Sequence, residues 1–108
     1  MPKQGPSSAN EVEIIVTSKS GPVRQFAERI EGRVKSLGLA VDVLFPHEEI
    51  PIRKVLTDLS NRGTLYGIIL TPLNQEHGSI TLNILFGQPE GKATVFAVVT
   101  YFQLTELI

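Results

Sequence analysis

The 108-residue sequence contains no cysteine, which excludes disulfides, thiolate nucleophiles and thiolate metal ligands together. No apolar run approaches the ~20 residues that a membrane-spanning helix needs. Neither sign of charge is in excess, because ten Lys and Arg against eleven Asp and Glu give a formal net charge of -1. No overall field therefore draws the chain to phosphate, and nucleic-acid binding would need a local basic patch.

Motifs for nucleotide binding and catalysis are also missing. The turn SKSGPV, which follows the first apolar run, has a single glycine followed by a proline, so it matches neither the dinucleotide fingerprint nor the P-loop. No Gly-x-Ser-x-Gly elbow is present. His47 and His77 fall in different predicted loops and do not supply the three ligands of a metal site. We predict no catalytic residue, no cofactor and no metal, and hence no enzyme.

What the sequence does contain is a regular alternation of short apolar runs and helical patterns. With 42% hydrophobic residues it has the composition of a globular domain. Residues 1–10, rich in Pro, Gly and Ser, indicate a flexible leader, and residues 11–108 a single domain. Apolar runs at 11–18, 40–46 and 65–72 predict strands. Helical patterns at 23–37 and 51–62 separate these runs, as in parallel β-α-β units.

Two further runs extend this sheet. After a predicted polar loop at 74–78, alternating residues at 79–87 indicate a strand that runs antiparallel to its predecessor or lies at an edge. The run at 93–99 can pair back as a hairpin. The predicted fold is α/β, with three layers α/β/α and a mixed, mostly parallel sheet of four to five strands.

Apolar spacing predicts which side chains form the core. Ser20 and Pro22 begin the first helix, and Gly38 ends it. On its outer face, Glu31 and Lys35 are one turn apart. The inward face of this helix continues to Leu37. We expect nine large apolar residues to be buried together: Val16, Phe26, Ile30, Val34, Val43, Leu56, Leu59, Ile68 and Ile69.

Over residues 11–87 the sequence resembles the anticodon-binding domain of class IIa aminoacyl-tRNA synthetases. The similar stretches are FAERIEGRVKSLGLAVDV and IPIRKVLTDLSNRGTLYGIIL. Lys54 matches a lysine of that family, whereas Arg53 replaces the glycine common at that helix start. VKSLGLAVDVLF and LSNRGTLYGIILTPLNQEHGSITLNILFGQPE resemble a branch found in a nuclear transcription coregulator. Residues 91–108 depart from that branch and form a divergent tail.

The resemblance implies a non-catalytic binding domain of a nuclear transcription coregulator, which contacts RNA, a protein partner, or both. The protein partner would be a nuclear receptor or another transcription protein. The alternative is a tRNA anticodon-binding domain of a synthetase-like protein, located in the cytoplasm. A small-molecule enzyme has no specific feature in its favour.

Candidate contact residues follow from the predicted fold. Open α/β sheets bind ligands at the carboxyl ends of their parallel strands, where we place Lys19, Arg53, Lys54 and Gln75 as an RNA site. Near the C-terminus, Leu104, Leu107 and Ile108 share one face of a helix, as in short leucine motifs that dock into receptor grooves. The same spacing is what any core-facing helix shows, and it favours a terminal helix that packs on the sheet.

Overall fold

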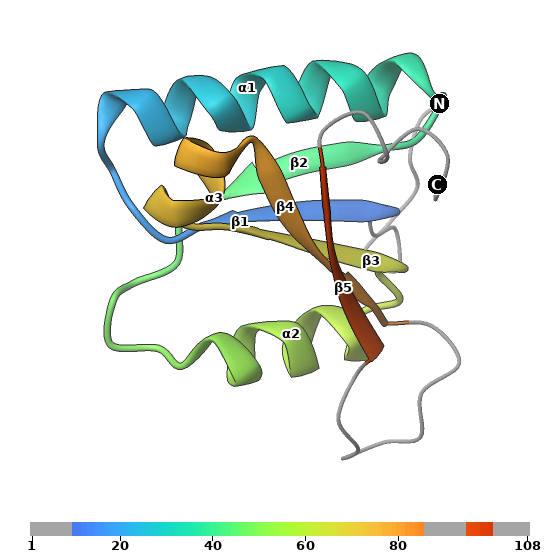
Figure 1. Cartoon of the computed structure of the whole chain (residues 1–108). Coiled ribbons are helices and arrows are strands. Elements are labelled where there is room, and N and C mark those ends of the chain that lie inside the picture. The colour runs from blue at the N-terminus through green and yellow to red at the C-terminus, as the bar shows by residue number, and fades with distance from the viewer. Residues whose placement is uncertain (1–9, 86–94, 101–108) are drawn as a thin grey trace.

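The computed structural model describes residues 10–85 together with the backbone of residues 95–100. In this part of the chain a five-stranded sheet of order β2-β1-β3-β4-β5 lies between helices (Figure 1). The elements follow one another as β1 (Val12–Val16), α1 (Gly21–Ser36), β2 (Val41–Leu44), α2 (Ile52–Asn61), β3 (Tyr66–Leu70), α3 (Pro72–His77), β4 (Ser79–Ile84) and β5 (Val95–Thr100).

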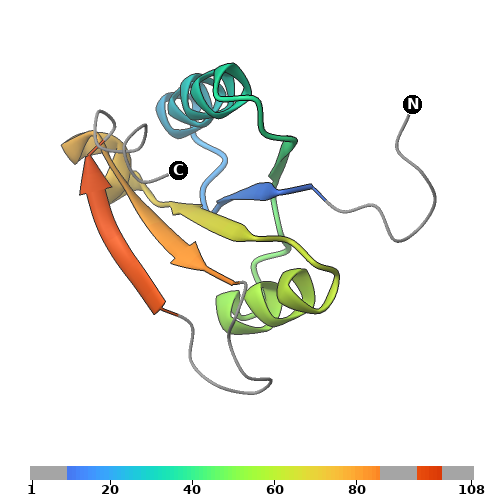
Figure 2. The same ribbon diagram turned by 90° about the vertical axis from the view of Figure 1, so that its right-hand side faces the viewer.

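Strand pairing confirms the predicted mixed α/β sheet. β1 pairs in parallel with both β2 and β3, whereas β4 pairs antiparallel with β3 and with β5. α1 covers one face of the sheet and α2 the other (Figures 1 and 2). The carboxyl ends of β1, β2 and β3 therefore meet at one edge, where α1 and α2 both begin and α3 follows β3. This edge is the left side of Figure 1.

The first helix begins and ends as predicted. The Ser20 hydroxyl accepts a hydrogen bond from the Val23 N–H at 3.5 Å, and Pro22 occupies the first turn. Gly38, with a φ of 87°, reverses the chain afterwards. The prediction for Leu37 is wrong: it is 37% exposed, because the helix ends at Ser36 and Leu37 is its C-cap.

The predicted polar loop after β3 is in fact the short helix α3. The Thr71 hydroxyl accepts from the Asn74 N–H at 3.1 Å, and the Asn74 side chain accepts from the Thr71 N–H at 3.0 Å. This capping box stabilises the start of α3, which lacks the apolar periodicity by which a helix is usually predicted. Leu73 is 60% exposed, so no inward apolar face signalled the helix in the sequence.

The buried apolar residues form two clusters, one on each face of the sheet, rather than the single predicted core. Val12, Ile14 and Val16 of β1 face α1, whereas Ile15 faces α2. The predicted core residues divide accordingly. On the α1 face lie Val16, Phe26, Ile30, Val34 and Ile68, with Val43 half-buried, and on the α2 face lies Leu59, with Leu56 and Ile69 half-buried.

A glycine sets how closely α2 approaches the sheet. A Cβ atom on Gly67 of β3 would lie 2.9 Å from Cδ2 of Leu56. Beside it, the Asn83 side-chain amide donates to the Gly67 carbonyl at 3.2 Å. The α2 face thus combines a close helix contact with a buried polar side chain.

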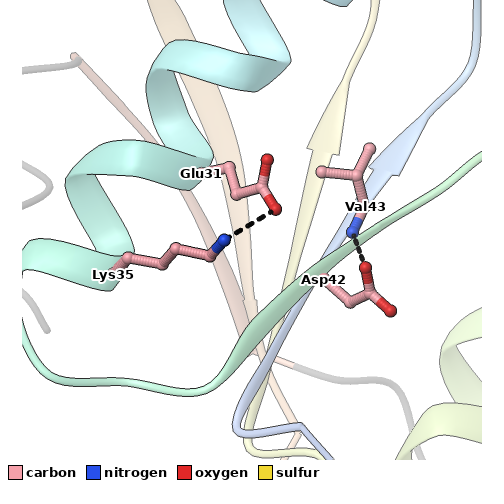
Figure 3. Close-up of polar contacts among 4 residues, drawn as sticks. All are labelled: Glu31, Lys35, Asp42 and Val43. Carbon is pink, nitrogen blue, oxygen red and sulfur yellow. Dashed lines mark hydrogen bonds and ion pairs between the residues drawn. The ribbon is translucent and has the colours of Figure 1, made fainter.

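β2 is an outer strand of the sheet and is four residues long. Val12 donates to the Ala40 carbonyl, and successive backbone groups of a strand alternate in direction, so Val43 directs its N–H away from β1. The Asp42 carboxylate accepts from this N–H at 2.9 Å (Figure 3). The same view shows the predicted Glu31–Lys35 ion pair on α1, at 3.5 Å.

Candidate functional site

The predicted RNA site falls on the edge where the parallel strands end. Lys19 lies in the connection from β1 to α1, and Arg53 and Lys54 lie in the first turn of α2. Gln75 lies on α3, which follows β3 directly. Three separate parts of the sequence therefore reach the same edge through the alternation of strands and helices (Figure 1).

Two helix N-termini add to the positive character of this edge. α1 and α2 both begin here, and neither has an acidic residue in its first turn. Pro51, the N-cap of α2, provides no side-chain hydrogen bond to the first turn. Unneutralised N-terminal dipoles favour an anionic group. Glu48 and Glu49, both exposed in the loop before α2, oppose this preference locally.

Arg53 and Lys54 are available to an anionic ligand. Both side chains are exposed. The Lys54 ammonium lies 3.9 Å from the Asp58 carboxylate, but the two side chains are 65% and 58% exposed, so solvent screens the pair and it stabilises little. Arg53 makes no ion pair with any residue between 10 and 85.

The structure separates Gln75 from these two cations. Gln75 lines an open cavity of about 380 Å³ between α1 and α3. Its other lining residues are Pro22, Gln25, Phe26, Arg29 and Gly78. We did not predict Gln25 or Arg29, because polar residues one turn apart on a helix are typical of a solvated surface. The contact with α3 could not be foreseen while α3 was taken for a loop.

A second, larger cavity of about 520 Å³ lies on the other side of the sheet, beside β2 and α2. Leu44, Pro46, Ile50 and Val55 contribute apolar side chains to it. Ile50 is 41% exposed at its margin. Asp58, Asn61 and Arg62 line the cavity as well, so it is a mostly apolar surface that no described part of the chain covers, a feature typical of protein contacts.

Phe45 follows β2 and is held by a cation from α1. The Arg24 guanidinium lies 5.7 Å from the centre of the Phe45 ring. Phe45 remains 41% exposed, so this contact is made at the surface. It joins the loop before α2 to the first turn of α1.

One carboxyl group is buried away from the candidate edge. Burial raises the pKa of Glu13, which is on the α2 face of β1, and the nearby Asp42 carboxylate raises it further. A hydrogen bond from the Asn10 side chain at 2.9 Å and the charge of Arg62 lower that pKa but do not reverse the shift. Glu13 lies near the beginning of its strand, so it does not belong to the candidate site.

The described residues contain no grouping of three or more His, Asp or Glu side chains that could hold a metal ion. His47 and His77 are both exposed and lie on separate segments. No helix in the part of the chain that the structure describes is long and apolar enough to cross a membrane. The predicted protein-contact residues Leu104, Leu107 and Ile108 lie outside the described residues.

Sequence comparison identifies relatives of this chain. No protein-family profile matches the chain. The chain is 35% identical over 77 residues to nuclear receptor coactivator 5 of human and of mouse. This match covers 71% of the chain, which spans only 13% of the length of those relatives.

Two solved structures share the fold. Prolyl-tRNA synthetase from Cryptosporidium parvum superposes with a TM-score of 0.71 at 14% identity, covering 87% of this chain and 20% of the synthetase. The RNA-binding domain of threonyl-tRNA synthetase from the same organism superposes with a TM-score of 0.69 at 13% identity, covering 90% of this chain and 22% of that one.

Proposed function

Because this chain contains an anticodon-binding-like domain homologous to part of nuclear receptor coactivator 5, we propose that it is a non-catalytic module of a nuclear coregulator that binds RNA. The RNA contact is the edge at which the parallel strands end. Lys19, Arg53 and Lys54 supply the charges there. Nuclear location and RNA as ligand are both parts of this proposal.

The observation that supports the RNA contact is the convergence of two helix N-termini and these three cations on one edge. Phosphate contacts account for much of the affinity in protein–RNA complexes, and backbone N–H groups at helix N-termini contribute to them. The homologous coactivator and the structurally similar synthetase domain both favour a binding role over catalysis.

With only three cations in the contact, we expect the affinity for RNA to be modest and sensitive to salt. Each neutralised phosphate of a single strand contributes about 0.7 to the slope of log K against log salt concentration. Three phosphates would therefore give a slope of about -2. A neutral protein surface without such contacts would show almost no salt dependence.

The test is fluorescence anisotropy of labelled single-stranded RNA at several salt concentrations. The double variant Arg53→Glu/Lys54→Glu should bind more weakly, with a reduced salt slope. The matched control is Arg33→Glu/Lys35→Glu, which reverses two cations in the last turn of α1, at the opposite edge. Binding that is unchanged in the first variant, or weakened equally in both, would contradict the proposed contact.

The apolar cavity beside β2 and α2 supports a second candidate, a protein partner bound there. A purified receptor domain would be titrated against Ile50→Glu, which places a charge at the cavity margin, and against Leu107→Ala. Loss with Ile50→Glu alone would favour the cavity. Loss with Leu107→Ala alone, without a change in thermal stability, would favour the predicted leucine segment.

A further inference from the structure

The cavity between α1 and α3 is formed by one stripe of α1 that faces the end of α3. Pro22, Gln25, Phe26 and Arg29 recur at steps of three and four residues, so they share this side of the helix. Gln75 and Gly78 close the other side. A volume of about 380 Å³ is at the lower end of the range for small-ligand sites, which begins near 300 Å³.

The polar groups of the cavity suit a ligand that has a planar ring and, next to the ring, a negatively charged group. Two carboxamides provide hydrogen-bond donors and acceptors together, as the edge of a nucleobase requires. The Arg29 guanidinium provides the planar fork that binds phosphate. The described residues that line the cavity include no acidic one, and Pro22 and Phe26 give it an apolar wall.

No described residue occupies these polar groups. The side chains of Gln25, Arg29 and Gln75 make no hydrogen bond or ion pair with another residue in the range 10–85. Gln25 and Arg29 are exposed, and Gln75 is half-buried. A ligand could therefore use them without breaking a bond that stabilises the fold.

We infer that this cavity binds one nucleotide of a single-stranded RNA, with its base between Gln25 and Gln75 and its phosphate on Arg29. The inference rests on the proposed function and deepens it. Arg53 and Lys54, at the edge where the parallel strands end, contribute affinity that is independent of the RNA sequence. The α1–α3 cavity contributes a preference for particular bases. Lys19 lies three residues before Pro22, in the connection from β1 to α1.

A first experiment needs only free nucleotides. The four ribonucleoside monophosphates are titrated into the labelled protein, and the side-chain amide resonances of Gln25 and Gln75 are followed by NMR. We expect both to shift, more with one base than with the others, together with the Arg29 Nε–H resonance. Shifts at Arg29 that inorganic phosphate reproduces, with the two amides unmoved, would overturn the base site.

A second experiment uses RNA. Gln25→Leu/Gln75→Leu removes the amides while keeping similar side-chain size, and Asn61→Leu removes an exposed amide from α2 as a control. The double variant should lower the ratio of affinities between oligo-A, oligo-C and oligo-U by roughly tenfold, since a good base contact contributes about 1–3 kcal/mol of discrimination. The dependence on salt should stay unchanged.

The outcomes separate the two proposals. If the double variant keeps the base preference while Arg53→Glu/Lys54→Glu weakens binding to every RNA, the base site is wrong and the RNA contact stands. If the native domain binds none of the RNAs, the proposed function is wrong and the base site falls with it. Backbone resonances of β1 and β3 report whether each variant is folded.

Discussion

The two faces of the sheet differ in how much apolar side chain they bury. Among the described residues, thirteen form the buried cluster under α1, whereas four form the one under α2. α1 has sixteen residues and a side-chain N-cap, while α2 has ten and no such cap. Because hydrophobic burial is the main favourable term in folding, we expect the α1 face to contribute most of the stability.

The α2 face contains polar groups at positions where the α1 face has aliphatic ones. The strand register places Asp42, Glu13, Gly67 and Asn83 in one row across it. Glu13 and Asn83 are buried there. The two faces therefore differ in what they contribute. The α1 face contributes most of the buried core, and the α2 face leaves apolar surface uncovered beside β2.

The largest expected effect tests this division with the same substitution on both faces. Ile30→Ala on α1 should cost about 2–5 kcal/mol, because Ile30 is fully buried and its loss leaves a cavity. Ile69→Ala on the α2 face should cost less, because Ile69 is only half-buried. Urea denaturation measures both. Equal losses would remove the proposed asymmetry between the faces.

A smaller effect is expected where α2 touches the sheet. Gly67→Val should destabilise the domain by about 1–3 kcal/mol, because its side chain would overlap Leu56. Leu56→Ala in the same chain should recover part of that loss. Gly32→Val on the exposed side of α1, where nothing lies within 4 Å, is the matched control and should change little. Additive losses in the double variant would show that the contact with Leu56 is not the cause.

The smallest effect concerns pH. Because burial raises the pKa of Glu13, protonation of this side chain favours the folded state. This contribution to stability is fully present below the ordinary value of 4.5 and is lost as pH rises through the raised value. Glu13→Gln should therefore raise the melting temperature at neutral pH, and the gain should shrink below pH 4.5. Glu28→Gln, on the exposed face of α1, is the control. A gain that is constant from pH 4 to 8 would contradict a buried, charged Glu13.

Much of the fold could be predicted because local signals and burial agree. The strand runs, the Ser20 cap and the Gly38 stop each specify an element without help from distant residues. The division of the buried residues into two clusters could not be predicted, because apolar spacing does not show which face of a sheet a residue lies on. α3 was missed because a capping box, rather than an apolar face, holds it in place.

The candidate site was predictable only in part. Residues that follow parallel strands can be assigned to one edge of a sheet, which is why Lys19, Arg53, Lys54 and Gln75 could be named from the order of elements. Gln25 and Arg29 could not be named, because their position in a cavity depends on where α3 packs. Which side chains share a cavity is a property of tertiary packing.

The carboxylate at the outer edge of β2 has a consequence for the behaviour of the protein at high concentration. Unpaired N–H groups on an outer strand act as a template for the strand of another molecule, and this is a common start of aggregation. Asp42 already occupies the outward N–H of Val43, so an arriving strand must first displace a charged group. Short length and fixed negative charge together make β2 a poor nucleus for sheet growth.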